Sequence, residues 1–314
     1  MLSIITPAYN EVQNLPALRE RLEVHLSELD IEWEWIIIDD GSRDGTYELV
    51  SQWAAVDQRI RGARLSRNYG SHAALACGLK VARGNAMVFI AADLQDPPEI
   101  VGELITSWRA GAKVVWAVPQ QYTRIGLRTL YYALLRRGDG LADQPLDGGD
   151  MVLIDRAVAT VLIASEERHS NIFARIRLAG FTQDSVCYRK EARNKGLSGW
   201  TLRKKLKLVL DSLTGFDHAL VRTMTYLGAL VAIAGFVLAL YVVVLAFAGE
   251  PPMGWASIMT AILILGGVQM IFLGILGEYA WRTLDETRGR PLYVVEAATD
   301  AKHANDVTPT ADSL

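Results

Sequence analysis

Oxygen-bearing side chains that can hold a divalent cation follow a short apolar run in the first half of the chain. Residues 86–90 predict a buried strand, and Asp93, Gln95 and Asp96 come directly after it. Open α/β sheets bind ligands at the carboxyl ends of their strands, so these side chains are expected at a ligand-binding edge. Oxygen donors two positions apart suit a cation that already carries phosphates, which makes Asp93 and Gln95 candidate metal ligands. The competing interpretation is an ordinary turn rich in Asp and Pro.

Further polar clusters fall at the ends of other predicted strands. The strands and the clusters that follow them are 2–6 with 7–11, 35–38 with 39–42, and 61–65 with 66–72. A predicted helix comes after each cluster, and residues 113–118 form the next strand. Strands that alternate with helices predict a doubly wound, mostly parallel α/β sheet with right-handed crossovers. In such a sheet all these clusters lie at one edge, which is the predicted site.

The bulk composition separates the chain into two parts. It has 314 residues, a formal net charge of −3 and 51% hydrophobic residues. The charge balance gives no indication of nucleic-acid binding. The two cysteines, Cys77 and Cys187, do not predict a disulfide framework, and no signal peptide is expected. The apolar excess is concentrated after residue 220, so a soluble α/β part is expected to precede a membrane-associated part.

The apolar part contains two almost uncharged stretches, 226–248 and 255–277, each longer than the roughly 20 residues that a bilayer requires. Lys and Arg flank them on both outer sides and are missing from the linker 249–254, which predicts cytoplasmic flanks. Residues 202–216 predict an amphipathic helix in the membrane interface. The competing interpretations are two buried helices of a soluble domain and an ordinary surface helix. Residues after Ala297 are small and polar and predict disorder.

This pattern predicts four regions. They are a cytoplasmic catalytic domain in 1–200, an interfacial amphipathic helix in 201–221, two transmembrane helices in 222–281 and a cytoplasmic tail in 282–314.

The polar motifs, taken in order, resemble a known family. Pro-Ala-Tyr-Asn-Glu at 7–11, Asp-Asp-Gly-Ser at 39–42, Ser-Arg-Asn-Tyr-Gly at 66–70 and Ala-Asp-Leu-Gln-Asp-Pro-Pro at 92–98 resemble family 2 glycosyltransferases of the GT-A fold. Three more motifs, at 146–150, 274–279 and 289–293, are similar to those of polyprenyl-phosphate glycosyltransferases. That group includes bactoprenol glucosyltransferases, the aminoarabinose transferase of lipid A modification and dolichol-phosphate mannose synthases. The resemblance covers residues 1–296.

The resemblance implies a reaction and its participants. A sugar moves, with inversion, from a nucleotide-sugar such as UDP-glucose to polyprenyl phosphate, in bacteria undecaprenyl phosphate, for cell-envelope glycan or lipid modification. Mg²⁺ or Mn²⁺ is the implied cofactor. The implied location is the bacterial inner membrane, multi-pass, with the catalytic domain and both termini in the cytoplasm. The implied assembly is a homo-oligomer, a tetramer in relatives.

The resemblance also assigns roles to residues of this chain. Those expected to contact the base and ribose, or to lie beside them, are Pro7, Tyr9, Glu11, Asp39, Asp40 and Ser42. Asp93 and Gln95 would hold the metal, Asp93 would thereby serve catalysis, and Arg193 would close over the donor phosphates. Asp150 would act on the acceptor, either as a general base or as an orienting group. A turn carboxylate that caps backbone N–H groups is the competing interpretation of Asp150.

The chain departs from the family pattern at three positions. Ala91 replaces the first Asp of the frequent Asp-x-Asp motif, Pro119 replaces an Arg, and Gly199 replaces a Lys. Arg124 or Arg128 could replace the missing arginine in the donor site. These departures favour one alternative, a non-catalytic membrane scaffold with a degenerate glycosyltransferase domain. A second alternative, a processive polysaccharide synthase, lacks support because its Q-x-x-R-W motif is missing from this sequence.

Overall fold

The computed structural model describes residues 1–120, 151–165, 171–189 and 254–300, together with single positions between 230 and 244. Arg124, Arg128, Asp150 and Arg193 lie outside the described residues. The chain divides into two compact units, which are described separately. One unit comprises Met1–Leu202 with Pro291–Leu314, and the other comprises Arg203–Arg290.

The first unit is built on an eight-stranded sheet of order β7-β5-β6-β4-β1-β2-β3-β8. Its strands are β1 (Leu2–Ala8), β2 (Trp33–Asp39), β3 (Ile60–Leu65), β4 (Ala86–Phe89), β5 (Val114–Pro119), β6 (Val152–Asp155), β7 (Gln183–Tyr188) and β8 (Val295–Ala298). β6 pairs antiparallel with β4 and β5, and β8 pairs antiparallel with β3. The other strands run in one direction. This arrangement confirms the predicted α/β class and the common edge at which the parallel strands end.

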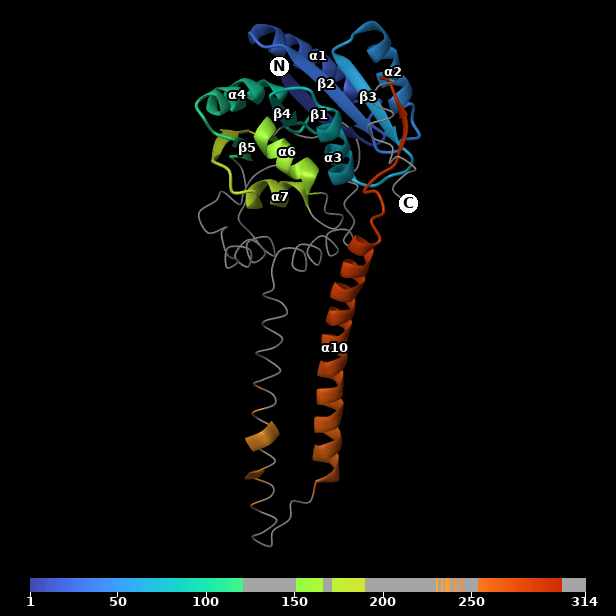
Figure 1. Ribbon diagram of the computed structural model, residues 1–314, viewed down its shortest axis with the longest axis vertical. Helices are drawn as coiled ribbons and strands as arrows, with labels where there is room; N and C mark the ends of the chain where they lie inside the picture. The colour runs from blue at the N-terminus through green and yellow to red at the C-terminus, as the bar shows by residue number, and fades with distance from the viewer. Residues whose placement is uncertain are drawn as a thin grey trace. The chain divides into compact units, whose positions relative to one another are not determined.

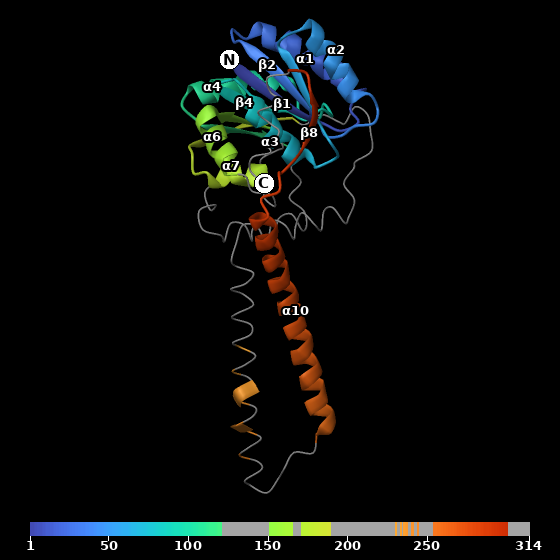
Figure 2. The same cartoon turned by 45° about the vertical axis from the view of Figure 1, so that its right-hand side comes forward.

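Helices cover both faces of the sheet (Figures 1 and 2). One face packs against α1 (Leu15–Glu28), α2 (Thr46–Val56) and α4 (Val101–Arg109), with the 3₁₀ turn η1 (Pro98–Ile100) leading into α4. The other face packs against α3 (Ser71–Val81), α6 (Arg156–Ala164) and α7 (Ile172–Leu178). Because helices cover both faces, the central strands read as continuous apolar runs, as expected for a buried parallel sheet.

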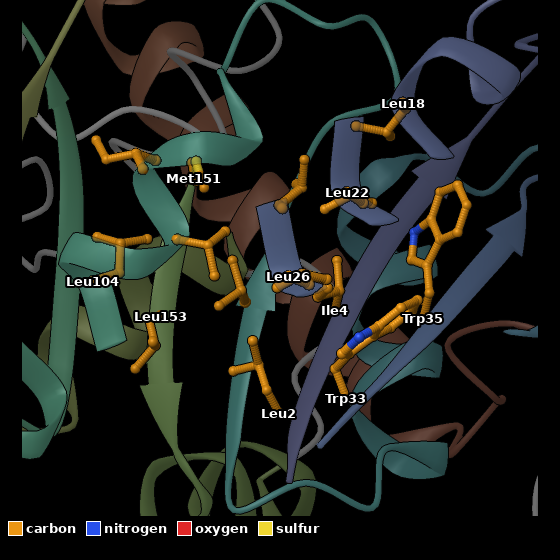
Figure 3. Close-up of a cluster of buried hydrophobic side chains, with 14 of the residues drawn as sticks. Leu2, Ile4, Leu18, Leu22, Leu26, Trp33, Trp35, Leu104, Met151 and Leu153 are labelled. Carbon is orange, nitrogen blue, oxygen red and sulfur yellow. The ribbon is translucent and has the colours of Figure 1, made fainter. Parts of the chain in front are cut away.

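The core on the first face shows why α1 forms and which strands it packs against. Its leucines recur at helical spacing and are at most 1% exposed, at Leu15, Leu18, Leu22 and Leu26. Figure 3 shows Leu22 and Leu26 against Ile4 of β1, with Trp35 of β2 beside them. Each fully buried leucine contributes about 1.5–3 kcal/mol. This packing makes the sheet a rigid base for the loops at its carboxyl edge.

The segment after Pro291 returns to the sheet as β8 (Figure 2). Thr299 continues the pairing, since its N–H donates to Gly62 O at 2.9 Å and its Oγ1 accepts from Gly62 N at 2.9 Å. Asp300 Oδ2 pairs with Arg83 Nη2 at 2.8 Å and lies 3.9 Å from Arg61 Nε. The prediction of disorder after Ala297 is therefore wrong for residues 298–300. Local composition could not predict that these residues are ordered, because contacts with distant parts of the chain hold them in place.

Removing the Asp300 carboxylate should loosen this edge. Partly exposed ion pairs contribute up to about 1 kcal/mol, so Asp300→Ala should lower the melting temperature of the full-length protein by about 2–4 °C. Differential scanning calorimetry or fluorescence-monitored melting measures the shift. Glu28→Ala is the matched control, because the Glu28 side chain is 70% exposed and lies 3.9 Å from His25. Equal melting temperatures for both variants would contradict an anchoring role for Asp300.

The second unit contains the long helix α10 (Trp255–Thr287). Its exposed apolar side chains include Ile258, Ile262, Met270 and Leu273, each more than half exposed. Within the described part of the chain, no helix was found whose length and apolar character would let it cross a membrane. The predicted interfacial helix in 201–221 lies outside the described residues. The membrane assignments for 201–281 stay predictions.

Candidate active site

The carboxyl ends of four adjacent parallel strands bring the predicted site residues together. In the order β4-β1-β2-β3, the loop after β1 lies between the loops after β4 and β2. Ala8 is opposite Asp39, and Asp39 is opposite Arg64, in the strand register. Tyr9, directly after β1, therefore lies between Asp39 on one side and the turn with Asp93 on the other. The spacing of the motifs predicted this common edge, and the sheet topology supplies it.

Asp39 is the most deeply buried carboxylate at this edge, at 1% exposed. Its Oδ1 accepts from Ser42 N at 3.0 Å, and its Oδ2 lies 3.6 Å from Arg64 Nε. Oδ2 and Arg64 Nε are buried, and neither has a hydrogen-bond partner among the described residues. Burial raises the pKa of the Asp39 carboxyl, although the hydrogen bonds from Ser42 and the charge of Arg64 oppose this effect. A buried oxygen without a donor is costly, so this atom has the properties of a ligand acceptor.

Asp40 has a different environment. Its Oδ1 accepts from Tyr69 N at 2.7 Å and its Oδ2 accepts from Gly70 N at 2.8 Å. Burial raises the pKa of this carboxyl to about 6. Asp40 thus fixes the loop after β3, and its predicted contact with a substrate stays a prediction. Gly41 allows the two loops to approach, because its φ is +73° and a Cβ there would lie 2.7 Å from Arg67 C.

The loops after β1 and β2 are joined by side-chain hydrogen bonds. Asn10 N donates to Ser42 Oγ at 2.9 Å, and Glu11 N donates to Thr46 Oγ1 at 3.1 Å. Asn10 Oδ1 in return accepts from Arg43 N at 3.0 Å. Asn10 has a φ of +58°, a conformation that a short polar side chain tolerates better than most. The two loops therefore form one structure, and the predicted base-binding residues belong to it.

The predicted aromatic contact of this site is exposed. Tyr9 is 47% exposed, which is unusual for a ring so close to the sheet. Pro7 belongs to β1 and pairs in register with Ile38. Glu11 accepts from Asn14 Nδ2 at 2.6 Å through its Oε2. Of these three residues, Tyr9 presents the largest flat apolar surface for a planar ligand.

The turn after β4 presents its residues alternately. Ala91, Asp93 and Gln95 are half-buried, whereas Ala92, Leu94 and Asp96 are buried. Asp93 and Gln95 thus share the accessible side of the turn, together with Ala91. Clusters of three or more His, Cys, Asp or Glu with the geometry of a metal site do not occur among the described residues. Two oxygen ligands nevertheless fit Mg²⁺ or Mn²⁺ that takes its other ligands from a diphosphate and water.

Two other residues near this edge are occupied by aromatic contacts. The His72 ring packs edge-on against Phe173 at 5.6 Å, and burial lowers the pKa of this histidine to about 4. The Arg67 guanidinium lies 4.3 Å from the Tyr69 ring.

Arg64 is a site residue that the sequence did not predict, because it occupies an interior position of a predicted strand. The available signal was a charged residue in an apolar strand, two positions before the Ser66 motif.

Comparison with known proteins gives several similarities. Residues 3–153 match the family described as Glycosyl transferase family 2. An uncharacterized glycosyltransferase, sll0501, of Synechocystis sp. is 35% identical over 300 residues, covering 94% of this chain and 94% of that protein. The SfII prophage-derived bactoprenol glucosyl transferase of Shigella flexneri is 31% identical over 301 residues, covering 94% of this chain and 97% of that protein. A solved glucosyl-3-phosphoglycerate synthase from Mycobacterium tuberculosis has a TM-score of 0.48 and 18% identity, covering 67% of this chain and 78% of that chain.

The family match extends from β1 into β6, and the similarity to both relatives continues over nearly the whole chain. The mixed α/β sheet, with its polar loops at one edge, fits the GT-A fold. The chain therefore belongs to glycosyltransferase family 2 and is a glycosyltransferase.

Proposed function

We propose that this enzyme transfers a sugar from a nucleotide-sugar, with UDP-glucose as the first candidate, to undecaprenyl phosphate. The transfer is metal-dependent and inverting, and it takes place at the cytoplasmic face of the bacterial inner membrane. The product, a polyprenyl-phosphate sugar, serves cell-envelope glycan or lipid modification. The observation that carries the donor part is the buried Asp39 Oδ2, which has no hydrogen-bond partner within the described part of the chain and lies at the same sheet edge as Tyr9, Asp93 and Gln95.

The donor base is assigned from hydrogen-bond chemistry. A buried carboxylate oxygen accepts an N–H, and uracil and guanine each present a ring N–H where cytosine and adenine present an acceptor. Asp39 Oδ2 therefore favours UDP or GDP over CDP and ADP. The exposed Tyr9 ring supplies a surface on which the base can stack. Arg64, 3.6 Å from Asp39, keeps the charge of this carboxylate compensated.

The turn after β4 supplies the metal ligands. Asp93 and Gln95 would hold Mg²⁺ or Mn²⁺ on the accessible side of the turn. A bound divalent cation would stabilise the charge that develops on the departing nucleoside diphosphate. Asp93 contributes the only carboxylate of this pair, so the donor site depends on it more than on Gln95.

The acceptor is proposed from the relatives and from the apolar segment. The Shigella flexneri relative is named a bactoprenol glucosyl transferase, and its similarity extends through the apolar stretches 226–248 and 255–277. Exposed apolar side chains on α10 also support attachment to a membrane. The second pKa of a phosphate monoester is about 6, so the acceptor is largely dianionic at neutral pH. Because such an acceptor needs little deprotonation, we assign Asp150 an orienting role. The family resemblance places Arg193 at the donor phosphates.

The test offers four labelled donors to the purified full-length protein in detergent with undecaprenyl phosphate. UDP-glucose, UDP-galactose, UDP-N-acetylglucosamine and GDP-mannose are supplied separately, with Mg²⁺, Mn²⁺ or EDTA. Label in the organic phase, from one donor and lost with EDTA, is the expected result. No lipid product from any donor, combined with no nucleotide binding, would overturn the proposal and favour the scaffold alternative.

Restoring the missing carboxylate of the metal turn should strengthen metal binding. Ala91 lies on the same side of the turn as Asp93, so Ala91→Asp adds an oxygen ligand without disturbing the buried side. We expect the half-saturating Mn²⁺ concentration to fall by about tenfold, which corresponds to about 1.4 kcal/mol. Titration of activity with Mn²⁺ measures the change, and Ala91→Asn separates charge from size. An unchanged Mn²⁺ requirement would place the metal away from this turn.

A further inference from the structure

The metal turn has a buried side whose residues have no part in the proposed function. Ala92, Leu94 and Asp96 alternate with the accessible Ala91, Asp93 and Gln95. Leu94 is 3% exposed and Asp96 is 2% exposed. A buried carboxylate two residues from the core leucine requires a partner, because an unpaired buried charge is strongly destabilising. The partner of Asp96 shows what fixes the turn.

The backbone of this turn is strained at Leu94. Its φ of +59° is in the left-handed region, which costs a residue with a Cβ about 1–2 kcal/mol. Burying the leucine side chain contributes about 1.5–3 kcal/mol, which offsets this strain. The Asp93 side chain adds a local bond, since its Oδ1 accepts from Gln95 N at 3.2 Å. The turn with this geometry leaves Asp93 and Gln95 on its accessible side.

Asp96 is held by a residue 92 positions away in the sequence. The Tyr188 hydroxyl at the end of β7 donates a hydrogen bond to Asp96 Oδ1. Tyr188 is 5% exposed and belongs to the same hydrophobic cluster as Leu94. Its backbone is fixed as well, because β7 pairs with β5 and Gln120 N donates to Tyr188 O at 2.7 Å. A buried hydrogen bond therefore attaches the turn to the edge strand β7.

We infer that Asp96 and Tyr188 are positioning residues for the metal ligands Asp93 and Gln95. The inference rests on the proposed metal dependence of this site. The phenol holds Asp96 inward, and the alternation of the turn then keeps the two ligands outward. Partners behind metal ligands typically change metal affinity by about 10- to 100-fold when they are removed. The pair therefore acts on the metal site without touching metal or donor.

The test removes one hydroxyl and measures Mn²⁺ binding directly. Tyr188→Phe in the full-length protein should weaken Mn²⁺ binding in the presence of UDP about tenfold, detected by electron paramagnetic resonance of free Mn²⁺. High Mn²⁺ should restore most of kcat for sugar transfer. Tyr293→Phe is the matched control, since Tyr293 is also buried, at 4% exposed, and packs near Lys80 rather than the metal turn. Its Mn²⁺ binding should be unchanged, and the melting temperatures of both variants show whether a general loss of stability explains the change in Mn²⁺ affinity.

A second variant tests whether the two residues act together. Asp96→Asn keeps an acceptor for the phenol, so its loss of Mn²⁺ affinity should be smaller than that of Tyr188→Phe. The double variant should lose no more affinity than Tyr188→Phe alone, because both changes act on the same contact. Additive losses, or a Tyr188→Phe variant whose Mn²⁺ binding matches that of Tyr293→Phe, would overturn the inference. A wild-type protein that binds no Mn²⁺ in the presence of UDP would overturn the inference as well. If the wild type binds Mn²⁺ but makes no lipid product, the proposed acceptor fails while this comparison still decides the positioning role.

Discussion

Replacing Asp93 with alanine should slow sugar transfer by at least about 1,000-fold, because metal stabilisation of developing charge contributes several kcal/mol and each 1.36 kcal/mol is tenfold in rate. Asp93 is the only carboxylate on the accessible side of the turn 91–97. Gln95→Ala should have a smaller effect, since it removes a neutral ligand. Initial rates at saturating donor and acceptor, measured over a Mn²⁺ titration, test both expectations.

The Asp93 prediction has a matched control on the same domain. Asp184 is an exposed carboxylate of β7 that lies away from the site edge. Asp184→Ala therefore removes the same charge as Asp93→Ala without changing the site. It should retain wild-type rates and Mn²⁺ dependence. Asp93→Ala should also keep the wild-type melting temperature within a few degrees, because it leaves the buried side of the turn intact. More than one tenth of wild-type activity in Asp93→Ala, with unchanged metal dependence, would place the metal elsewhere.

The sequence predicted the site edge because strand period and motif position are local signals. An apolar run followed by polar residues predicts a strand end, and parallel strands end on one side. The same reasoning could not separate Asp39 from Asp40. Asp39 has a buried oxygen with no hydrogen-bond partner among the residues that the structure describes, whereas Asp40 accepts two backbone N–H groups from the loop after β3.

Other features depend on contacts between distant parts of the chain. The sequence Val295–Ala298 has weak strand propensity, yet pairing with β3 makes it a strand. Arg64 became part of the site only because β3 lies beside β2. The inward direction of Asp96 follows from Tyr188, 92 positions later. Local sequence patterns cannot predict such features, because each depends on a partner residue that the local sequence does not identify.

Replacing Asp39 with asparagine should weaken UDP binding by roughly 100-fold. A hydrogen bond to a charged group contributes about 1.5–3 kcal/mol, and the variant also removes the carboxylate charge 3.6 Å from Arg64 Nε. Isothermal titration with UDP and CDP measures both affinity and base preference. The wild type should prefer UDP strongly, and Asp39→Asn should lose most of that preference because an amide both donates and accepts. Asp57→Asn, at the end of α2 beside Arg59, is the control and should bind as the wild type does.

The pH dependence provides an independent check on Asp39. Burial raises the pKa of Asp39 and raises that of the adjacent Asp40 to about 6. A carboxyl with a raised pKa is ionised above that value and protonated below it, so its acceptor function is lost as the pH falls. The affinity ratio of wild type to Asp39→Asn should therefore shrink as the pH is lowered from neutral into the acidic range. Comparing the two proteins with one ligand cancels the protonation of UDP itself. A ratio that stays constant over this range would show that ionised Asp39 does not recognise the base, and the donor assignment would then depend on Tyr9 and the metal turn alone.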